Sequence, residues 1–159
     1  MRERAGDVVE FELDVAQLLD PARRDEHIRD IATSAADAMK TADTVIRTTR
    51  TVVTAADPDE SLAISRSVSA ALVETVRLIT ATHRPAFVIA KGGITSSDTA
   101  THGLRIRRAW ARGTLLPGIV SLWQPADGPA AGIPYIVFAG NVGGDDALAD
   151  ALALLRSAA

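Results

Sequence analysis

The 159-residue sequence predicts one α/β domain of three layers, in which helices flank a mixed β-sheet. Two similar successions favour this class. The apolar run Pro85–Ala90 leads into a Gly-Gly turn and a helix-like segment, and the run Pro134–Ala139 leads into a Gly-rich turn and a second helix. Short β-like runs lie between them. Because no linker, repeat or low-complexity tract interrupts the chain, we expect a single domain over residues 1–159.

Composition restricts the classes of function. Hydrophobic residues make up 47% of the chain, which is enough for a full core, and the absence of cysteine excludes disulfides, thiolate metal sites and cysteine nucleophiles. A formal net charge of -3 gives no general attraction for nucleic acid or anionic membrane. No apolar run approaches the roughly 18 residues that span a bilayer. We therefore expect a cytoplasmic protein that binds neither nucleic acid nor membrane.

The first half of the sequence predicts two strands and two helices. Apolar residues alternate with acids over residues 7–14, which indicates a short strand near a sheet edge. Asp20-Pro21 is typical of a helix start, and this helix should run to about Thr41. Residues 44–54 are rich in β-branched side chains and predict a strand. Asp57-Pro58 begins the most strongly marked helix, which should end near residue 83.

The second half predicts a central strand followed by shorter ones. Pro85–Ala90 is apolar throughout, as expected of a strand that is covered on both faces. Three further runs, separated by Gly113 and other turn residues, should be mostly antiparallel strands: residues 104–111, 118–124 and 134–139. Asp145 or Asp146 should cap a last helix, which carries Leu148, Leu152 and Leu155 on one face.

The segment from Lys91 to Gly103 has the composition of an anion-binding turn. Gly92 and Gly93 can bring bare amides against a ligand, and the hydroxyl groups and Asp98 can cap the following helix. A second turn, Gly140 to Gly144, has the same context. If the two preceding strands are neighbours, the turns would form two walls of one nucleotide crevice. Two ordinary turns explain the pattern as well. No GxxxxGK[ST] loop and no complete GxGxxG is present.

Other polar residues allow two interpretations each. Lys91 can reach a phosphate or simply end a strand, and Asp98 can hold Mg²⁺ through water or act as a capping residue. The segment from Arg105 to Arg112, which contains Trp110, suits single-stranded nucleic acid or a solvated strand face, and the acidic chain favours the second. The three histidines show no metal-ligand spacing, and no serine lies in a GxSxG motif.

Two segments, KGGITSSDTATHGLRIRRAWARGTLLPG and GIPYIVFAGNVGGDDALADAL, resemble the C-terminal nucleotide-binding domain of the four-carbon acid sugar kinase family. Members of that family phosphorylate sugar acids such as threonate and erythronate with ATP. The resemblance implies ATP and Mg²⁺ as cofactors, and it leaves the catalytic residue unknown. It places the nucleotide-binding residues at Gly92, Gly93, Ile94, Thr95, Gly140, Asn141, Val142 and Gly143.

The sequence also departs from the family pattern. Family members have an N-terminal domain that binds the sugar acid, and 159 residues leave no room for it. A glycine-serine turn that the family would place upstream of Val8 finds no match. We therefore expect the C-terminal half of a kinase, inactive alone, whose sugar acid binds through the missing domain. The alternative is a non-catalytic nucleotide-binding module, or a subunit that completes a site with a partner chain. The sequence leaves a homo-oligomer open.

Overall fold

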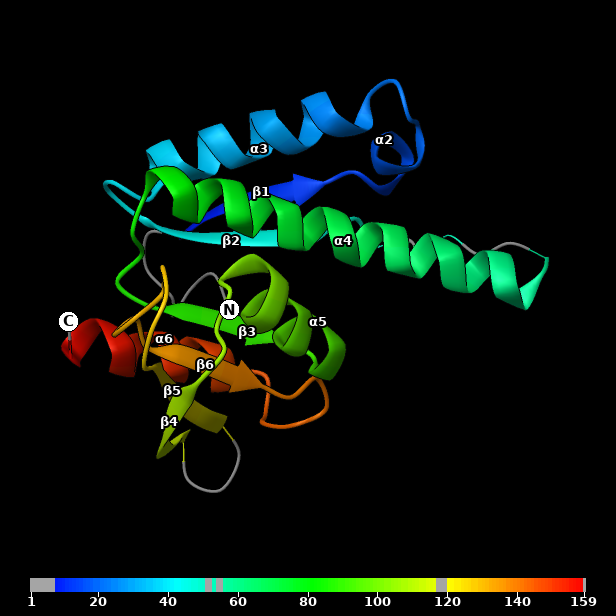
Figure 1. Cartoon of the computed structure of the whole chain (residues 1–159). Helices are drawn as coiled ribbons and strands as arrows, with labels where there is room; N and C mark the ends of the chain where they lie inside the picture. Colours follow the sequence, from blue (N-terminus) through cyan, green and yellow to red (C-terminus); the bar gives the residue numbers. More distant parts are fainter. Residues whose placement is uncertain (1–7, 51–52, 54–55, 117–119, 159) are drawn as a thin grey trace. The chain divides into compact units, whose positions relative to one another are not determined.

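The computed structural model describes residues 8–50, 53, 56–116 and 120–158 (Figure 1). The chain divides into two compact units, one built from Val9–Arg84 and the other chiefly from Pro85–Ala159. The expected α/β class is confirmed. The described strands form two sheets, one of two strands and one of four, where the sequence suggested one. None of the described helices is long and apolar enough to cross a membrane.

The first unit packs two helices against each other beside a small sheet. Strands β1 (Val8–Leu13) and β2 (Asp43–Thr48) pair with each other. Helix α3 (Arg24–Ala38) packs against the long helix α4 (Pro58–Thr82), and the short helix α2 (Val15–Leu19) contacts both. One buried cluster joins these elements and consists of Leu13, Leu18, Ile28 and Ala71.

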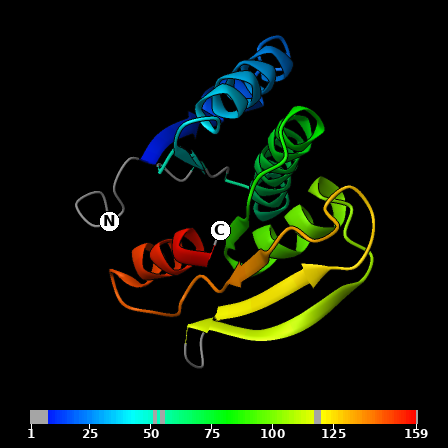
Figure 2. The same ribbon diagram turned by 90° about the vertical axis from the view of Figure 1, so that its left-hand side faces the viewer.

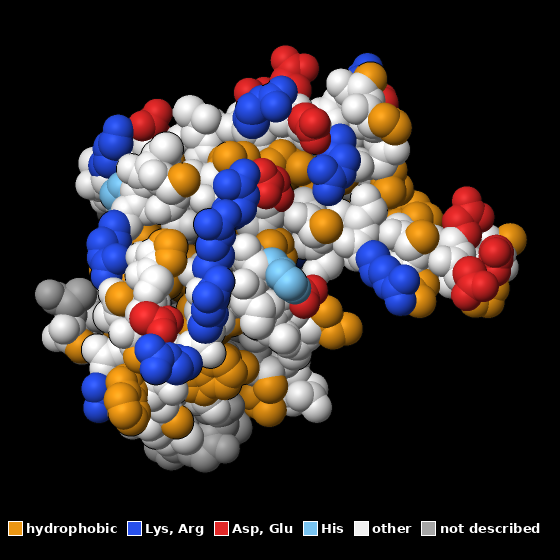
Figure 3. Space-filling model, viewed as in Figure 1, with side chains coloured by type: hydrophobic (Ala, Val, Ile, Leu, Met, Phe, Trp, Pro, Cys, Tyr) orange, Lys and Arg blue, Asp and Glu red, His pale blue; other side chains and the backbone are white. Residues whose placement is uncertain are grey.

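The helix starts in this unit show where local capping patterns succeed. Helix α4 begins as predicted, because the Asp57 carboxylate accepts a hydrogen bond from Asp59 N at 3.1 Å. Figure 3 shows acidic side chains gathered at this end of α4, where they complement the helix dipole. The predicted start at Asp20 is wrong. Its carboxylate accepts from Ala22 N at 2.9 Å and forms a separate turn, so α3 begins only at Arg24.

Two further differences concern the same unit. Helix α2 was not predicted, although Asp14 caps it by accepting from Ala16 N at 2.9 Å. The strand predicted over residues 44–54 ends at Thr48 in β2. Three residues of that predicted strand, 51, 52 and 54, lie outside the described residues.

The second unit contains a mixed sheet in the order β3-β6-β5-β4. Strand β3 (Val88–Lys91) runs parallel to β6 (Tyr135–Phe138). Strand β5 (Val120–Pro125) is antiparallel to both β6 and β4 (Ala109–Leu116). The prediction that residues 85–90 form a central strand is wrong, because β3 lies at an edge of the sheet that the described residues form. Its apolar character comes instead from helices on its two faces.

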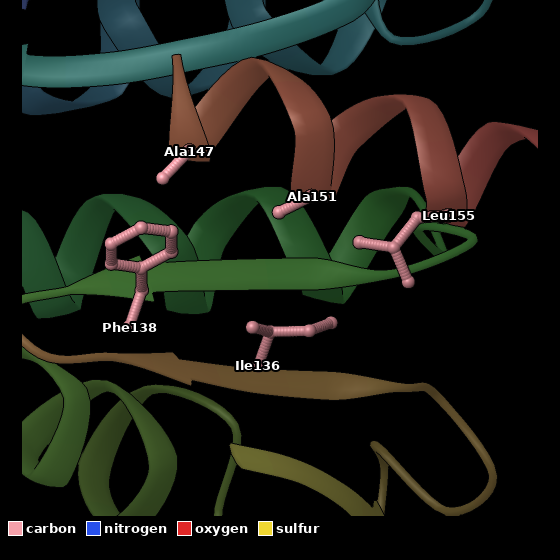
Figure 4. Packing of buried hydrophobic residues seen from close by; sticks show 5 residues of the cluster. All are labelled: Ile136, Phe138, Ala147, Ala151 and Leu155. Atoms are coloured by element: carbon pink, nitrogen blue, oxygen red, sulfur yellow. The ribbon is translucent and has the colours of Figure 1, made fainter. Parts of the chain in front are cut away.

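The side chains of alternate strand residues define these faces. Ile136 and Phe138 pack against helix α6 (Ala147–Ala158), as Figure 4 shows. Tyr135, which points the other way, donates from Oη to Ser96 O at 2.6 Å in helix α5 (Gly93–Asp98). The unit is therefore layered as helix, sheet and helix, with β3 and β6 between α5 and α6 (Figure 2).

Strand β4 differs from the predicted strand over residues 104–111. Residues 104–106 close the C-terminal end of the preceding helix, because Leu104 N donates to Thr99 O and Ile106 N to Ala100 O, both at 2.8 Å, and β4 begins only at Ala109. Gly113 does not separate two strands. It lies inside β4 at a register shift with φ of 111°, a backbone angle that suits glycine.

Candidate functional site

The two glycine turns begin at the same end of the sheet, where the carboxyl ends of β3 and β6 lie side by side. Strands β3 and β6 are parallel neighbours with Lys91 opposite Phe138, so the turns that follow them begin side by side. Gly92 N donates to Phe138 O at 2.8 Å, and a Cβ built on Gly140 would lie 3.7 Å from Gly92 Cα. The strands are thus neighbours, which is the condition for a site that both turns share.

The first turn begins a helix without any side-chain cap. Gly92 has φ of 105° and ψ of 147°, a conformation that only glycine adopts readily, and α5 starts at the next residue. The expected capping role of Asp98 at this start is wrong, because Asp98 is the last residue of α5. The Ser96 hydroxyl instead lies 2.5 Å from Gly92 O and 2.7 Å from Ala90 O, within the turn.

The second turn crosses closely over the start of α6. Gly143 has φ of 80°, and a Cβ there would lie 2.5 Å from Ala147 Cβ and 3.5 Å from the Phe138 ring. Phe138 and Ala147 belong to the buried cluster between the sheet and α6 (Figure 4). The packing of that cluster therefore fixes the course of the turn, and Val142 packs against the cluster as well.

Both turns present backbone amides that have no partner in the described part of the chain. The amides of Gly93, Ile94 and Thr95 precede the first intrahelical bond of α5, which Ser96 N makes to Gly92 O at 3.0 Å. The same holds in the second turn for the amides of Gly140, Asn141, Val142 and Gly143. Exposed amides that converge on one place are the donors with which proteins bind phosphate.

The exposed surface of the two turns is largely backbone. Gly93, Gly140, Asn141 and Gly143 are exposed, while Thr95 and Val142 are half-buried. Ile94 is the conspicuous exception, because its large apolar side chain is 76% exposed in the first turn of α5. All eight residues that the resemblance assigned to the nucleotide therefore belong to two adjoining turns at the carboxyl ends of β3 and β6.

Charged residues near the turns have definite places. The Lys91 ammonium lies 4.3 Å from the centroid of the Phe138 ring and 3.5 Å from Gly140 O, so this side chain extends from β3 to the second turn. Asp98 is half-buried at the end of α5. Within the described residues, no group of three or more His, Asp or Glu side chains could hold a metal ion.

The arginine-rich segment, residues 105–112, leads into strand β4, which contains its second half. Arg108 donates from Nε and Nη2 to the Asp127 carboxylate at 2.9 and 2.8 Å, and Arg112 Nε donates to the Gln124 amide oxygen at 2.8 Å. Trp110 is 64% exposed between them. Exposed pairs of this kind are typical of a solvated strand face.

Sequence reasoning missed the part that Tyr135 takes beside the first turn. Its buried hydroxyl donates to Ser96 O where α5 changes into the π-helix η1 (Thr99–Gly103). Burial raises the pKa of Tyr135 well above its ordinary value, so the hydroxyl stays protonated and remains a donor. The available signal was a lone tyrosine in an apolar strand, because a buried hydroxyl needs a partner.

Comparison with known proteins agrees with the resemblance. The family model described as a nucleotide-binding C-terminal domain matches residues 1–148. A solved protein of the family DUF1537 from Bordetella bronchiseptica, a domain-swapped dimer with bound citrate, is similar to this chain at 23% identity and a TM-score of 0.68. The match covers 97% of this chain and 36% of the Bordetella chain. A second crystal form of that protein gives 25% identity and a TM-score of 0.65, over 97% and 34% of the two chains.

A DUF1537 protein from Haemophilus influenzae is similar at 20% identity and a TM-score of 0.60, over 94% of this chain and 34% of that one. The chain thus spans about a third of the length of these solved structures. No curated protein matches it. The family match over most of the chain and the shared fold lead to one conclusion: the chain belongs to the nucleotide-binding C-terminal domains of the DUF1537 proteins, the four-carbon acid sugar kinase family.

Proposed function

We propose that this domain binds ATP at its two glycine turns and forms the nucleotide-binding half of a kinase for four-carbon sugar acids such as threonate and erythronate. One observation carries the proposal. Parallel pairing of β3 with β6 brings together, at the carboxyl ends of the two strands, two turns whose amides have no partner among the described residues. Ligands of α/β sheets bind outside the carboxyl ends of the strands, and phosphate binds to bare amides.

The chemistry of the two turns suits the parts of a nucleotide. The amides of residues 93–95 and 140–143 would donate to phosphate oxygens, aided by the partial positive charge at the starts of the helices that follow. The exposed side chain of Ile94 would pack against the adenine or the ribose. These contacts involve seven of the eight residues that the family resemblance named, namely Gly93, Ile94, Thr95, Gly140, Asn141, Val142 and Gly143. The eighth, Gly92, donates its amide to Phe138 O and shapes the first turn instead.

Magnesium fits this site as a companion of the nucleotide. Mg²⁺ keeps several waters and commonly binds through substrate phosphates with one or two carboxylates. The described residues offer no cluster of three possible ligands, so the phosphates and water would supply most of the coordination. Asp98 is a candidate for a contact through water.

Phosphoryl transfer requires both reactants to be held in line, and it depends on positioning and electrostatic stabilisation. The chain spans about a third of the solved structures that it matches, and we propose that the sugar acid binds to a domain outside these residues. We expect the domain alone to bind ATP and to transfer no phosphate.

Calorimetric titration with Mg-ATP tests the nucleotide site. Gly93→Val adds a side chain where a Cβ would meet nothing within 4 Å, so the fold should tolerate it while ATP loses its approach. Gly144→Ala is the matched control, because that position is equally open and lies outside the predicted contacts. We expect at least a tenfold loss for Gly93→Val, about 1.4 kcal/mol, and less than a twofold change for the control.

Two results would refute the site: no binding of millimolar ATP by the wild-type domain, or equal affinity of the wild type and Gly93→Val. The kinase assignment needs a separate assay, in which the domain is combined with the N-terminal half of a family kinase and tested on a panel of sugar acids. Nucleotide binding without transfer to any of them would favour the non-catalytic module.

A further inference from the structure

Lys91 holds the only ammonium group at the junction of the two turns. The described chain has two lysines, and the other, Lys40, follows α3 in the first unit. Lys91 is the last residue of β3, so its backbone leads directly into Gly92 while its side chain reaches Gly140 O at 3.5 Å. The ammonium therefore lies at the start of the second turn, while the Lys91 backbone leads into the first turn, whose amides have no partner among the described residues.

The described partners of this ammonium are weak and carry no charge. The 3.5 Å distance to Gly140 O is at the limit for a hydrogen bond, and the contact with the Phe138 ring is a weak one because Lys91 is exposed to solvent. No carboxylate among the described residues pairs with Lys91, whereas Lys40 lies 2.7 Å from the Asp37 carboxylate. An ammonium has three donors, so Lys91 keeps at least one for a ligand.

The surroundings favour an anion as that ligand. Both turns contribute amide donors, and the start of α6 adds partial positive charge beyond the second turn. The Phe138 ring, which packs against α6, lies 4.3 Å from the ammonium at its centroid.

We infer that Lys91 binds the phosphate chain of the nucleotide beyond its first phosphate, and that it gives the site a preference for nucleoside di- and triphosphates over monophosphates. The inference rests on the proposed nucleotide site and adds the residue that distinguishes nucleotides by the number of their phosphates. A lysine is suited to this role because its compact charge follows phosphate oxygens without fixed geometry.

Calorimetric titration of the domain with AMP, ADP and ATP, each with Mg²⁺, tests the inference. Lys91→Met keeps an unbranched side chain of similar length and removes the charge. Because a hydrogen bond to a charged group is worth a tenfold change or more, we expect ADP and ATP to bind about tenfold more weakly, and AMP to change less than twofold. Lys91→Arg should retain affinity within about threefold, and Lys40→Met should match the wild type.

The outcomes separate this inference from the proposed function. If the wild type binds no adenine nucleotide, the nucleotide site itself is wrong and the inference falls with it. If the wild type binds ADP and ATP but Lys91→Met binds them equally well, only the inference is overturned. It is also overturned if Lys91→Met weakens AMP as much as ADP, because Lys91 would then only support the turn. Circular dichroism of each variant checks that the fold is retained.

Discussion

The turn after β3 and the turn after β6 both contain adjacent glycines, yet the backbone requires glycine at only some of these positions. In the first turn, Gly92 has φ of 105°, whereas Gly93 has an ordinary φ and open space around its Cβ position. In the second turn, Gly143 has φ of 80° and meets Ala147, whereas a Cβ at Gly140 would make an ordinary contact with Gly92. Each turn thus has one glycine that the fold requires, whereas Gly93, Gly140 and Gly144 could be replaced without strain. Of these three, Gly93 and Gly140 are the ones that the family resemblance assigns to the nucleotide.

This difference distinguishes the glycines that stabilise the fold from those that a ligand would require. A side chain at Gly92 or Gly143 would strain the backbone, so those glycines have a structural explanation. Gly93 and Gly140 have none, since L-residues could occupy both positions without strain. Bare backbone at an unstrained, exposed position is expected where a ligand approaches closely. The comparison therefore assigns Gly93 and Gly140 to the ligand, and substitutions at the four glycines test it.

Gly143→Ala should have the largest effect on stability. Its Cβ would lie 2.5 Å from Ala147 Cβ, which is on the rigid start of α6, and its φ of 80° adds backbone strain. We expect a loss of about 2–4 kcal/mol in the free energy of unfolding, from overpacking and the left-handed backbone together. Urea denaturation measures it. A loss below about 0.5 kcal/mol would mean that the turn has another conformation in solution.

Gly92→Ala should destabilise the protein less, because a Cβ there makes no contact shorter than 3.7 Å and only the backbone angles are unfavourable. We expect a loss of about 1–3 kcal/mol by urea denaturation. Gly93→Ala is the matched control one residue later, and at the first position of a helix it should be neutral or slightly stabilising. Equal losses in the two variants would contradict the distinction within the first turn.

The sequence predicted the elements around both turns better than their pairing. The α4 start was correct because the cap, the proline and the acids at Asp57–Glu60 act within one helical turn. The start at Asp20 failed because the same kind of residue can close a local turn instead. The edge position of β3 could not be predicted. An apolar run indicates that both faces of a strand are buried, but it does not tell which strands pair with it in the sheet.

The candidate site was predictable only in part, for a related reason. Glycine in a sequence indicates a turn, but it does not tell which residue takes a positive φ, so the difference between Gly92 and Gly93 appears only in the structure. The proximity of the turns depends on β3 and β6, which lie more than 40 residues apart in sequence. The bond from Tyr135 to Ser96 depends on the same pairing. The family could be predicted from the sequence because its two motifs, which contain Gly92–Thr95 and Gly140–Gly143, form the turns themselves.

Tyr135→Phe tests whether the two turns are tied together, because the hydroxyl joins β6 to the helix of the first turn. We expect a loss of about 1 kcal/mol at neutral pH, since Ser96 O keeps a bond from Thr99 N. The loss should depend on pH. In the unfolded chain tyrosine ionises near pH 10, whereas burial raises the pKa of folded Tyr135, so its contribution is present below about pH 10 and falls at higher pH.

The wild-type advantage over Tyr135→Phe should therefore fall by about 1.4 kcal/mol between neutral pH and about pH 11, which removes it and slightly reverses its sign. Other groups titrate in both proteins and cancel in the difference. Denaturation of the two proteins at several pH values measures it, and the chain has no other tyrosine to confuse the absorbance of tyrosinate. An advantage that stays constant to pH 11 would show that Tyr135 ionises normally in the folded state.

Gly140→Ala should have the smallest effect on stability and is the most direct test of the comparison. Its Cβ would make an ordinary contact of 3.7 Å with Gly92 Cα, so the free energy of unfolding should change by less than about 0.5 kcal/mol. A methyl group at this exposed position would still hold a ligand away from the amides of both turns. We expect at least a fivefold loss of Mg-ATP affinity by calorimetric titration, about 1 kcal/mol. If the variant kept both its stability and its affinity, neither backbone strain nor ligand binding would explain the glycine at position 140. The nucleotide would then have to bind through the first turn alone.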